Sequence, residues 1–536
     1  MARASTASVA RPPAPQAPPA RRPAILDRVE ELARQVVAAP GAPRLAVRSP
    51  LDRSTIGEVP RSTLDDVRAA IARARRAQEG WSHTDFADRA RIFLDFHDRL
   101  LARQEEILDL IQLECGKARK HAFEEVMDVA LVARYYAVHG EDLLAPESRK
   151  GVVPGLTQVE EHHHPKGVVA IISPWNYPLT LGVSDATPAL LAGNAVVAKP
   201  DLQTPFSALW ARALLVECGL PADLFLIVAG EGPELGPPLI AGANYVSFTG
   251  STATGRRIAS QAGERLIGCA LELGGKNPML VLADADLAAT TAGALRACFS
   301  SAGQLCISIE RLYVQRSIYD RFLAELVRAT RGLRLGAALD WSVDMGSLAS
   351  EKQLATVRSH VEDARAQGAG IEAGGQARPD LGPYFFEPTI VTGATPKMKL
   401  YAEETFGPVV AVYPFESVHE AIERANDSPY GLNASVWTSD VDHGRRIAAR
   451  LACGTVNINE AYAAAWGSVD APMGGFKDSG LGRRHGAEGI LRFTEAQTIA
   501  VQRGLPLAAP AGVPDEVFSR WFSAALKTLK RVPGLR

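Results

Sequence analysis

The feature that most constrains this chain of 536 residues is an alternation of short apolar runs with longer amphipathic segments. Apolar runs of strand length between turn residues predict strands, and apolar residues at helical spacing predict helices. In the first half of the chain, strands are predicted at 159–164, 167–173, 195–199, 225–229 and 245–249. Because helical segments such as 205–218 separate the later strands, parallel βαβ units and a doubly wound α/β sheet are predicted.

The same alternation resumes in the second half of the chain. It predicts strands at 279–282, 311–314 and 409–413 and helices at 318–330, 351–367 and 418–425. A chain of this length is too long for one ordinary hydrophobic core, so more than one domain is expected. We therefore predict two doubly wound α/β domains with the active site between them, because domain interfaces commonly hold ligands.

The composition excludes several classes of protein. The net charge is −2, so there is no basic field for nucleic-acid binding. No apolar run reaches membrane-spanning length, and no stable membrane anchor is expected. The six cysteines form no CxxC pair, which argues against a disulfide framework or a zinc ribbon and for the reducing cytoplasm. The run His162-His163-His164 would alternate between the two faces of a strand, so no metal site is predicted.

The N-terminal part of the chain divides into a tail and a helical region. The first 22 residues are rich in Ala, Pro and Arg and contain no acidic residue, which predicts a disordered tail. This segment is also Arg-rich and acid-poor like a transit peptide, but its prolines oppose an amphipathic helix. Ser62 and Asp65 then predict a capping box at the start of the first long helix.

Three polar side chains in separate segments have complementary chemistry. Cys306 follows a Gly-Gln turn, and a thiol is a strong nucleophile as its thiolate. Glu272, 34 positions earlier, can accept a proton from that thiol or from a water. Asn176, in Ser-Pro-Trp-Asn-Tyr-Pro, can donate a hydrogen bond to a developing oxyanion. Together they indicate covalent acyl chemistry, although a lone cysteine is more often a small buried hydrophobe.

Other segments are candidates for binding a cofactor. Gly250 and Gly255 lie between a predicted strand and a predicted helix, where backbone N–H groups can hold a phosphate. Their spacing is GxxxxG and not GxGxxG, so a tight turn of an α/β domain is the alternative. Lys199 ends a predicted strand, at the edge where such sheets bind ligands. Glu404 could hold ribose hydroxyls and Phe406 could pack on a flat ring, or both could belong to an ordinary surface loop.

Taken together, these segments resemble the aldehyde dehydrogenase superfamily over roughly residues 25 to 500. The motifs that carry the resemblance are Pro174-Trp175-Asn176-Tyr177-Pro178, Phe248-Thr249-Gly250-Ser251, Glu272-Leu273-Gly274-Gly275-Lys276, Gly303-Gln304-Leu305-Cys306, Glu404-Thr405-Phe406-Gly407-Pro408 and Met473-Gly474-Gly475-Phe476. The resemblance implies two Rossmann-like domains with a small β bridging element. It also implies oxidation of an aldehyde to a carboxylic acid with NAD(P)+ as the oxidant.

The resemblance implies a role for each catalytic candidate. Cys306 is the implied nucleophile and Glu272 the implied base for the deacylating water. Asn176 and the backbone N–H of Cys306 form the implied oxyanion hole. A CoA-acylating relative would lack the carboxylate of Glu272, and a cofactor-independent cysteine hydrolase would lack the cofactor segments.

The resemblance also implies the cofactor site. Lys199 would hold the adenosine ribose, Ser251 the pyrophosphate and Glu404 the nicotinamide ribose, with Phe406 beside the ring. Leu202 stands where NAD-preferring relatives carry a glutamate, which favours NADP+ and leaves NAD+ as the alternative. The full set of implied cofactor residues is Ser173, Pro174, Trp175, Lys199, Asp201, Leu202, Gly250, Ser251, Gly255, Glu404 and Phe406.

Within the superfamily, segments 165–190, 297–314 and 467–486 are similar to NADP-type succinate-semialdehyde dehydrogenases of actinobacteria, which implies succinate semialdehyde as the substrate. Better-understood relatives place carboxylate-binding arginines where this chain has Ser184 and Ser300, so another aliphatic or aromatic aldehyde is the alternative. The candidate substrate-pocket residues are Tyr177, Ser184, Ser300, Leu305 and Ile307.

The resemblance divides the chain into parts and implies a homodimer or homotetramer. The parts are a tail at 1–22, a dinucleotide-binding domain at 23–147 and 167–271, a catalytic domain at 272–479, an oligomerisation element at 148–166 and 480–503, and an extension at 504–536. The extension has apolar residues at helical spacing, which fits a helix docked on protein or one lying at a membrane surface.

Overall fold

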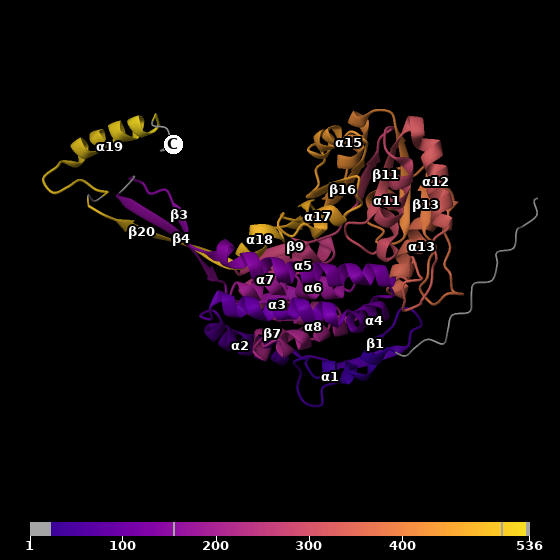
Figure 1. Ribbon diagram of the computed structural model, residues 1–536, viewed down its shortest axis with the longest axis horizontal. Coiled ribbons are helices and arrows are strands. Elements are labelled where there is room, and N and C mark those ends of the chain that lie inside the picture. The colour runs from indigo at the N-terminus through magenta and orange to yellow at the C-terminus, as the bar shows by residue number, and fades with distance from the viewer. Residues whose placement is uncertain (1–22, 154–155, 505–506, 532–536) are drawn as a thin grey trace, which may run out of the picture.

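The computed structural model describes residues 23–153, 156–504 and 507–531, so the predicted tail at 1–22 lies outside the described residues. Two helix-covered sheets lie beside each other, and a narrow antiparallel arm projects from the first of them (Figure 1). Both large sheets are mainly parallel, which confirms the predicted α/β class. Each of the two sheets has its own hydrophobic core.

The first sheet has six strands, in the order β19-β9-β8-β5-β6-β7. Their bounds are Val168–Ile172 for β5, Ala195–Lys199 for β6, Phe225–Ile227 for β7, Tyr245–Thr249 for β8, Gly268–Glu272 for β9 and Gly480–Leu481 for β19. All are parallel except β19, which pairs antiparallel with β9. The chain passes from β5 to β6 on one side and comes back to β8 on the other. The carboxyl ends of β5 and β8 therefore flank a switch point, the place where open α/β sheets bind ligands.

Long helices pack around this first sheet. They include α2 at Leu64–Trp81, α3 at Phe86–Ala102, α4 at Gln104–Cys115, α5 at Arg119–Leu144, α6 at Pro178–Val183, α7 at Ala186–Leu191, α8 at Pro205–Glu217, α9 at Gly232–Gly242 and α10 at Thr252–Glu264. The capping box of α2 lies one residue later than predicted, because Thr63 and Asp66 bond reciprocally at 2.8 and 3.2 Å. Ser62 instead donates to the carbonyl of Val37 at 2.6 Å.

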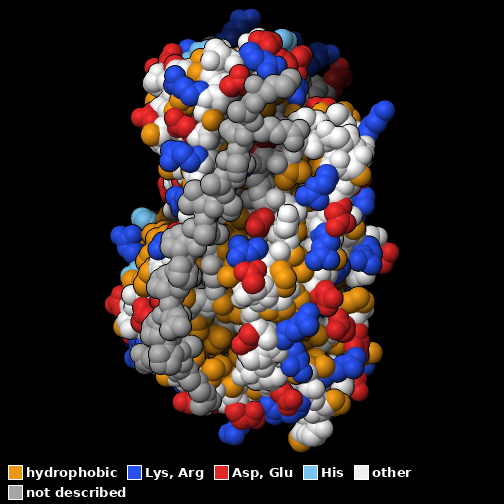
Figure 2. Space-filling model, turned by 90° about the vertical axis from the view of Figure 1, so that its right-hand side faces the viewer, with side chains coloured by type: hydrophobic (Ala, Val, Ile, Leu, Met, Phe, Trp, Pro, Cys, Tyr) orange, Lys and Arg blue, Asp and Glu red, His pale blue; other side chains and the backbone are white. Residues whose placement is uncertain are grey.

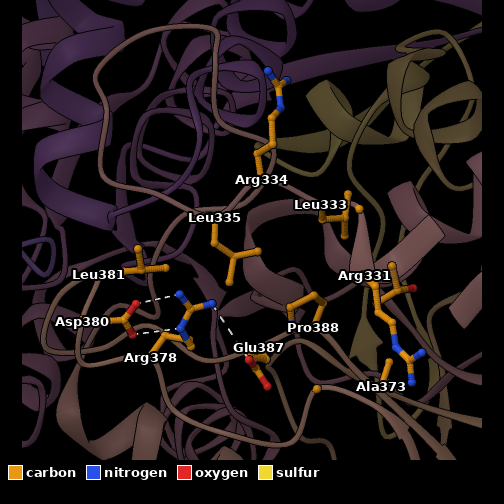
Figure 3. Close-up of a pocket in the computed structure, with 13 residues that line it drawn as sticks. Arg331, Leu333, Arg334, Leu335, Ala373, Arg378, Asp380, Leu381, Glu387 and Pro388 are labelled. Carbon is orange, nitrogen blue, oxygen red and sulfur yellow. Dashed lines mark hydrogen bonds and ion pairs between the residues drawn. The ribbon is translucent and has the colours of Figure 1, made fainter. Parts of the chain in front are cut away.

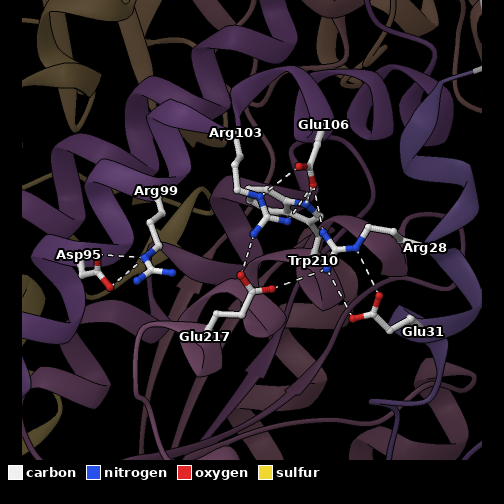
Figure 4. A network of polar contacts seen from close by, with 8 residues as sticks. All are labelled: Arg28, Glu31, Asp95, Arg99, Arg103, Glu106, Trp210 and Glu217. Carbon is white, nitrogen blue, oxygen red and sulfur yellow. Dashed lines mark hydrogen bonds and ion pairs between the residues drawn. The ribbon is translucent and has the colours of Figure 1, made fainter.

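A polar network centred on Glu106 of α4 ties the N-terminal segment to the helices of the first sheet (Figure 4). The carboxylate of Glu106 accepts hydrogen bonds from Arg28 at 3.1 Å, Arg103 at 2.9 Å and the indole N–H of Trp210 at 3.1 Å. Arg103 also donates to Glu217 at 2.7 Å. The network links α4 to α8 and to α1 at Val29–Ala33, so the start of the described chain is held to this half of the molecule.

The second sheet has seven strands, in the order β12-β13-β14-β11-β10-β16-β17. Their bounds are Asn277–Val281 for β10, Ile309–Gln315 for β11, Gly370–Ala373 for β12, Thr389–Thr392 for β13, Val409–Phe415 for β14, Asn433–Trp437 for β16 and Thr455–Ile458 for β17. Its helices include α11 at Leu287–Phe299, α12 at Tyr319–Arg331, α13 at Glu351–Ala366, α15 at Val418–Asn426 and α16 at Val441–Ala448. The predicted strands and helices of this half are all present, with bounds that differ by a few residues.

The arm is a three-stranded antiparallel sheet in the order β20-β4-β3, with bounds Thr494–Gln502, Thr157–Pro165 and Glu147–Arg149. It extends away from both large sheets and carries α19, at Asp515–Leu529, near its end (Figure 1). No residue of α19 is buried. The histidine run lies in β4, where His162, His163 and His164 face Gln497, Ala496 and Glu495 of β20 in register.

The surface mixes charges of both signs. On the face shown in Figure 2, Lys and Arg side chains alternate with Asp and Glu side chains, and hydrophobic side chains are scattered among them. Among the helices of the described residues, none is long and apolar enough to cross a membrane.

Candidate active site

The predicted nucleophile lies on a tight turn between α11 and β11. Ser301 and Ala302 there adopt positive φ angles of 53° and 55°, which non-glycine residues rarely adopt. Gly303 follows with φ +70°, and a Cβ at this position would lie 2.1 Å from the carbonyl oxygen of Gly407. The turn thus needs glycine at 303, and it brings the half-buried Cys306 to the edge of the second sheet that faces the first.

The predicted base is the last residue of β9, the strand that pairs with the edge strand β19 of the first sheet. Glu272 is 7% exposed, and among the described residues no hydrogen-bond partner contacts its Oε1. Burial raises the pKa of Glu272 to about 7, although Arg484 acts against that rise. A carboxyl group with such a pKa can both accept and release a proton near neutral pH.

The predicted oxyanion donor follows the carboxyl end of β5. The side-chain amide of Asn176 donates one hydrogen bond to the carbonyl of Gln304 at 3.0 Å, which leaves its second N–H for another acceptor. Asn176, Glu272 and Cys306 line one cavity of about 190 Å³. The structure therefore brings together three residues that are far apart in the sequence.

The thiol at this site is protonated at rest. Burial and the nearby carboxylates of Glu272 and Glu404 raise the pKa of Cys306 to about 12, although a hydrogen bond from the backbone of Ile307 favours the thiolate. A thiolate therefore forms only as a base takes the proton, and two carboxyl groups, Glu272 and Glu404, line the same cavity. Of the two, Glu272 is the better candidate, because among the described residues its Oε1 has no hydrogen-bond partner, whereas Glu404 is bonded to Gly275.

A second, larger cavity of about 730 Å³ lies at the switch point of the first sheet. Pro174, Trp175, Thr249, Gly250 and Ser251 line both this cavity and the one at Cys306, so the two are adjacent. Of the predicted cofactor residues, those that line the larger cavity are Ser173, Pro174, Trp175, Lys199, Asp201, Leu202, Gly250 and Ser251. We call this cavity the switch-point cleft.

The donors in the switch-point cleft suit a dinucleotide. Ser251 caps the N-terminus of α10, where unpaired backbone N–H groups favour an anion. Lys199 is buried and donates to the carbonyl of Pro200 at 3.2 Å, with N–H groups left over for a ligand. Burial lowers the pKa of Lys199. Gly255 lines neither cavity, and a Cβ at this position would lie 2.5 Å from the side chain of Leu273, so the close packing of α10 on Leu273 requires glycine here.

The remaining predicted cofactor residues, Glu404 and Phe406, line the cavity at Cys306. Glu404 accepts a hydrogen bond from the backbone N–H of Gly275 at 2.7 Å, and burial raises its pKa to about 8. Phe406 has a φ of +51° and meets the ring of Trp175 edge-on, with centroids 5.5 Å apart. Gln353 donates to the carbonyl of Phe406 at 2.6 Å and so supports this backbone conformation.

The predicted substrate-pocket residues are not among those that line these two cavities. Tyr177, Leu305 and Ile307 are buried, and Ser184 donates to Asp128 at 2.6 Å. Ser300 accepts a hydrogen bond from Tyr462 at 2.8 Å. It lines a different cavity of about 350 Å³, together with Lys120, Glu124, Arg296 and Asp344.

The sequence patterns missed an ion cluster next to Glu272. Asp185 accepts hydrogen bonds from Arg484 at 3.0 Å, Arg492 at 2.7 Å and Ser247 at 2.7 Å. Burial alone would raise the pKa of Asp185, but Arg484 and Arg492 hold it well below its usual range. No local spacing pattern links these residues, because Asp185 lies at the start of α7 and Arg484 and Arg492 lie about 300 positions later, after β19.

The largest of these cavities lies away from the reacting residues. It has about 880 Å³ and is lined by loops around residues 330–335 and 378–388 of the second half (Figure 3). Its Arg378 is already bonded to Asp380 at 2.6 and 2.8 Å and lies 3.9 Å from Glu387. We therefore choose the candidate active site by its chemistry, the grouping of Cys306, Glu272 and Asn176, and not by cavity size.

Comparisons with known proteins identify the family. The sequence profile described as "Aldehyde dehydrogenase family" matches residues 37–499. The chain therefore belongs to the aldehyde dehydrogenase family.

Individual relatives narrow the comparison. A protein of Mycolicibacterium smegmatis named "Putative succinate-semialdehyde dehydrogenase", with NADP(+) as its stated cofactor, is 52% identical over 476 residues, which is 89% of this chain and 92% of that protein. A protein of the same name from Mycobacterium tuberculosis, numbered 2, is 49% identical over 518 residues, or 97% of this chain and 100% of that protein.

Solved structures give the same result for the fold. An Escherichia coli NADP-dependent enzyme superposes with a TM-score of 0.84 at 34% identity, covering 88% of this chain and 99% of that chain. Betaine aldehyde dehydrogenase from Staphylococcus aureus in complex with NAD+ gives 0.83 at 33% identity, covering 90% of this chain and 98% of that chain.

Proposed function

We propose that this protein oxidises succinate semialdehyde to succinate, with NADP+ as the hydride acceptor. The observation that carries the proposal is that a thiol, a carboxyl group and an amide donor share one cavity, adjacent to a cleft with room and donors for a dinucleotide. The names of the mycobacterial relatives support the choice of substrate and cofactor.

The first chemical steps use groups that line the cavity. Glu272 takes the proton of Cys306, and the thiolate sulfur adds to the aldehyde carbonyl carbon. The oxygen of the adduct accepts hydrogen bonds from the free N–H of Asn176 and from the backbone N–H of Cys306. Bound NADP+ supplies a two-electron acceptor for the hydride of the adduct. The sulfur then carries the acyl group as a thioester.

Deacylation uses the same carboxyl group. After Glu272 has lost its proton to solvent, it takes a proton from water, and the hydroxide attacks the thioester carbonyl. The carbon–sulfur bond breaks, the acid leaves and Cys306 regains its proton. Overall, one aldehyde, one water and one NADP+ give one acid, one NADPH and one proton. A Glu272 pKa of about 7 suits both proton transfers, because the carboxylate is well populated at neutral pH.

The chemistry of the switch-point cleft supports NADP+ over NAD+. Leu202 lines the cleft and brings no negative charge toward a 2′-phosphate. The carboxylate of Asp201 accepts a hydrogen bond from the backbone of Gln203 at 2.9 Å, which occupies one of its oxygens. Lys199 and Arg257 both line the cleft and can attract a phosphate.

Another aldehyde is the second candidate for the substrate, and a specific observation favours it. Among the described residues that line the cavity at Cys306, none is cationic, so no partner for a substrate carboxylate is found there. A turnover screen of purified protein, with succinate semialdehyde and uncharged aldehydes and with both cofactors, tests the proposal. We expect the highest kcat/KM with succinate semialdehyde and NADP+. A higher value for an uncharged aldehyde would contradict the substrate.

Three further features belong to this proposal. The chain acts in the cytoplasm, and it forms a homodimer or homotetramer through the arm, with its oligomerisation element at 148–166 and 480–503. Support comes from β20, in which every residue after Thr494 is exposed in the single chain. The dinucleotide-binding domain is 23–147 with 167–271, and the catalytic domain is 272–479. Light scattering of the purified protein tests the oligomer, since a monomer would contradict it.

A further inference from the structure

We propose that the buried ion pair of Lys117 and Glu125 is a positioning device that aims the oxyanion donor Asn176 at Cys306. The inference rests on the proposed function, because it assigns the pair a part in the dehydrogenase reaction. None of the sequence motifs pointed to these two residues.

The pair is buried directly behind the Asn176 loop. Lys117 lies between α4 and α5, Glu125 lies on α5, and their side chains are 1% and 0% exposed. The ammonium of Lys117 donates to Glu125 at 2.7 Å and to the backbone carbonyl of Asn176 at 2.6 Å. It also lies 3.6 Å from the centre of the Tyr177 ring. The ammonium of Lys117 thus contacts a carboxylate, a carbonyl and the face of an aromatic ring, which accounts for its three N–H donors.

The carboxylate of Glu125 holds the other end of the same loop. It accepts hydrogen bonds from the backbone N–H groups of Leu179 at 2.8 Å and Thr180 at 3.1 Å. These N–H groups belong to the first turn of α6, where a helix has no internal acceptors for them. The pair therefore fixes the backbone on both sides of Tyr177 and Pro178.

The side chain of Asn176 is fixed from the opposite direction. Its amide donates to the carbonyl of Gln304 at 3.0 Å, two residues before Cys306. Gln304 is itself held, because it accepts from the backbone of Ala349 at 2.9 Å and donates to the carbonyl of Ser347 at 3.3 Å. A continuous chain of bonds thus runs from Glu125 through Lys117 and Asn176 to the nucleophile turn.

The orientation of Asn176 explains the buried ion pair better than a gain in stability does. Replacing a buried ion pair by apolar side chains is often neutral or stabilising, so the pair needs another reason to be present. Hydrogen-bond donors stabilise an oxyanion best when they are oriented before charge develops. Lys117 does not line the cavity at Cys306, so it acts through Asn176 and is a positioning residue.

A double-mutant cycle tests the inference. Lys117→Met is made in the wild type and in Asn176→Ala, and kcat/KM for the aldehyde is measured together with the Kd of NADP+. We expect Lys117→Met to lower kcat/KM by about 10- to 100-fold in the wild type, since small displacements of a donor cost that much. In Asn176→Ala the same change should cost less than about twofold, because the donor it positions is gone. The Kd of NADP+ should not change.

Equal losses in the two backgrounds would overturn the inference, as would a wild-type rate in Lys117→Met. If the wild type oxidises no aldehyde, the proposed function is wrong, and the inference that rests on it is overturned as well. Since Lys117→Met leaves the buried carboxylate of Glu125 without its cation, Lys117→Met with Glu125→Gln removes both charges and gives the same cycle if the single variant does not fold. Arg212→Met is the matched control, because Arg212 is a buried cation bonded to the carbonyls of Phe225 and Ala222, away from Asn176.

Discussion

The side chain of Asn176 and the backbone carbonyl of Gln304 are joined by a hydrogen bond of 3.0 Å. Asn176 follows β5 of the first sheet, and Gln304 belongs to the turn before β11 of the second sheet. This bond therefore crosses between the two halves of the molecule and places Asn176, the proposed oxyanion donor, next to the turn that carries Cys306. The geometry of these groups therefore depends on how the two halves pack.

Removal of the nucleophile should abolish oxidation. In Cys306→Ala we expect no aldehyde-dependent NADPH formation, because no other described cysteine lines the cavity with Glu272 and Asn176. The Kd of NADP+ should stay close to that of the wild type, since Cys306 does not line the switch-point cleft. Cys453→Ala, at a half-buried cysteine elsewhere, is the control. Substantial oxidation by Cys306→Ala would show that another group is the nucleophile.

Removal of the base should trap the acyl group. Glu272→Gln keeps the shape of the side chain but can take a proton neither from Cys306 nor from water. Acylation should then slow, because it depends on the small fraction of thiolate present, and deacylation should stop, so the thioester should accumulate slowly. Mass spectrometry after prolonged exposure to aldehyde and NADP+ should find an acyl adduct on Cys306, and steady-state turnover should fall to a small fraction of wild type. A normal steady-state rate in this variant would contradict the assignment. The same variant separates hydrolysis from CoA-dependent release, because added CoA should not restore turnover.

The rate of deacylation should depend on pH with a midpoint near neutrality. Burial raises the pKa of Glu272 to about 7, so the carboxyl group is mostly protonated below that pH and cannot act as a base. We expect deacylation to slow as the pH falls through about 7 and to level off above it. Single-turnover measurement of thioester decay from pH 5 to 9 checks this, in wild type. A decay rate independent of pH would exclude Glu272 as the base.

Loss of the oxyanion donor should lower kcat more than it changes substrate binding. Removing one such donor costs about 10²–10³ in kcat in other enzymes. We expect Asn176→Ala to fall in that range, because its free N–H is the side-chain donor beside Cys306. Steady-state kinetics with saturating NADP+ give the values. A change confined to KM would indicate that Asn176 binds the substrate without stabilising the oxyanion.

The sequence predicted the elements well where a local pattern decides them. The predicted strands at 195–199 and 245–249 have the same bounds as β6 and β8, because both are short, mostly apolar segments of one mainly parallel sheet. The capping box lies one residue later than predicted, because the side chain of Ser62 bonds to the carbonyl of Val37 and not to its own helix. Whether Ser62 bonds to its own helix or to a distant carbonyl is decided by the tertiary fold, which a local pattern does not show.

In the candidate site, too, local patterns predicted some residues and missed those that depend on the tertiary fold. Cys306, Glu272 and Asn176 were predictable from their chemistry and from the family resemblance. Lys117, Glu125 and Gln353 were not, because each acts through backbone groups of distant segments, and such contacts leave no spacing in the sequence. The predicted contact of Gly255 with the cofactor stays a prediction; in the structure Gly255 packs against Leu273.

We predict that residue 202 influences the choice between NADP+ and NAD+. Leu202 lines the switch-point cleft beside Lys199 and Asp201, and it carries no group that could bond to ribose hydroxyls. A carboxylate there could accept two hydrogen bonds from the adenosine ribose of NAD+. The same carboxylate would repel the 2′-phosphate of NADP+.

Leu202→Glu should therefore shift the preference toward NAD+. Hydrogen bonds to a charged group contribute about 1.5–3 kcal/mol, so the ratio of kcat/KM for NAD+ to that for NADP+ should rise by about 10- to 100-fold. Leu202→Met, which keeps an apolar side chain of similar size, is the control and should leave the ratio unchanged. The measurement is kcat/KM for each cofactor at saturating aldehyde in the three proteins. An unmoved ratio in Leu202→Glu would mean that residue 202 does not face the ribose, and the proposed NADP+ preference would lose its structural support.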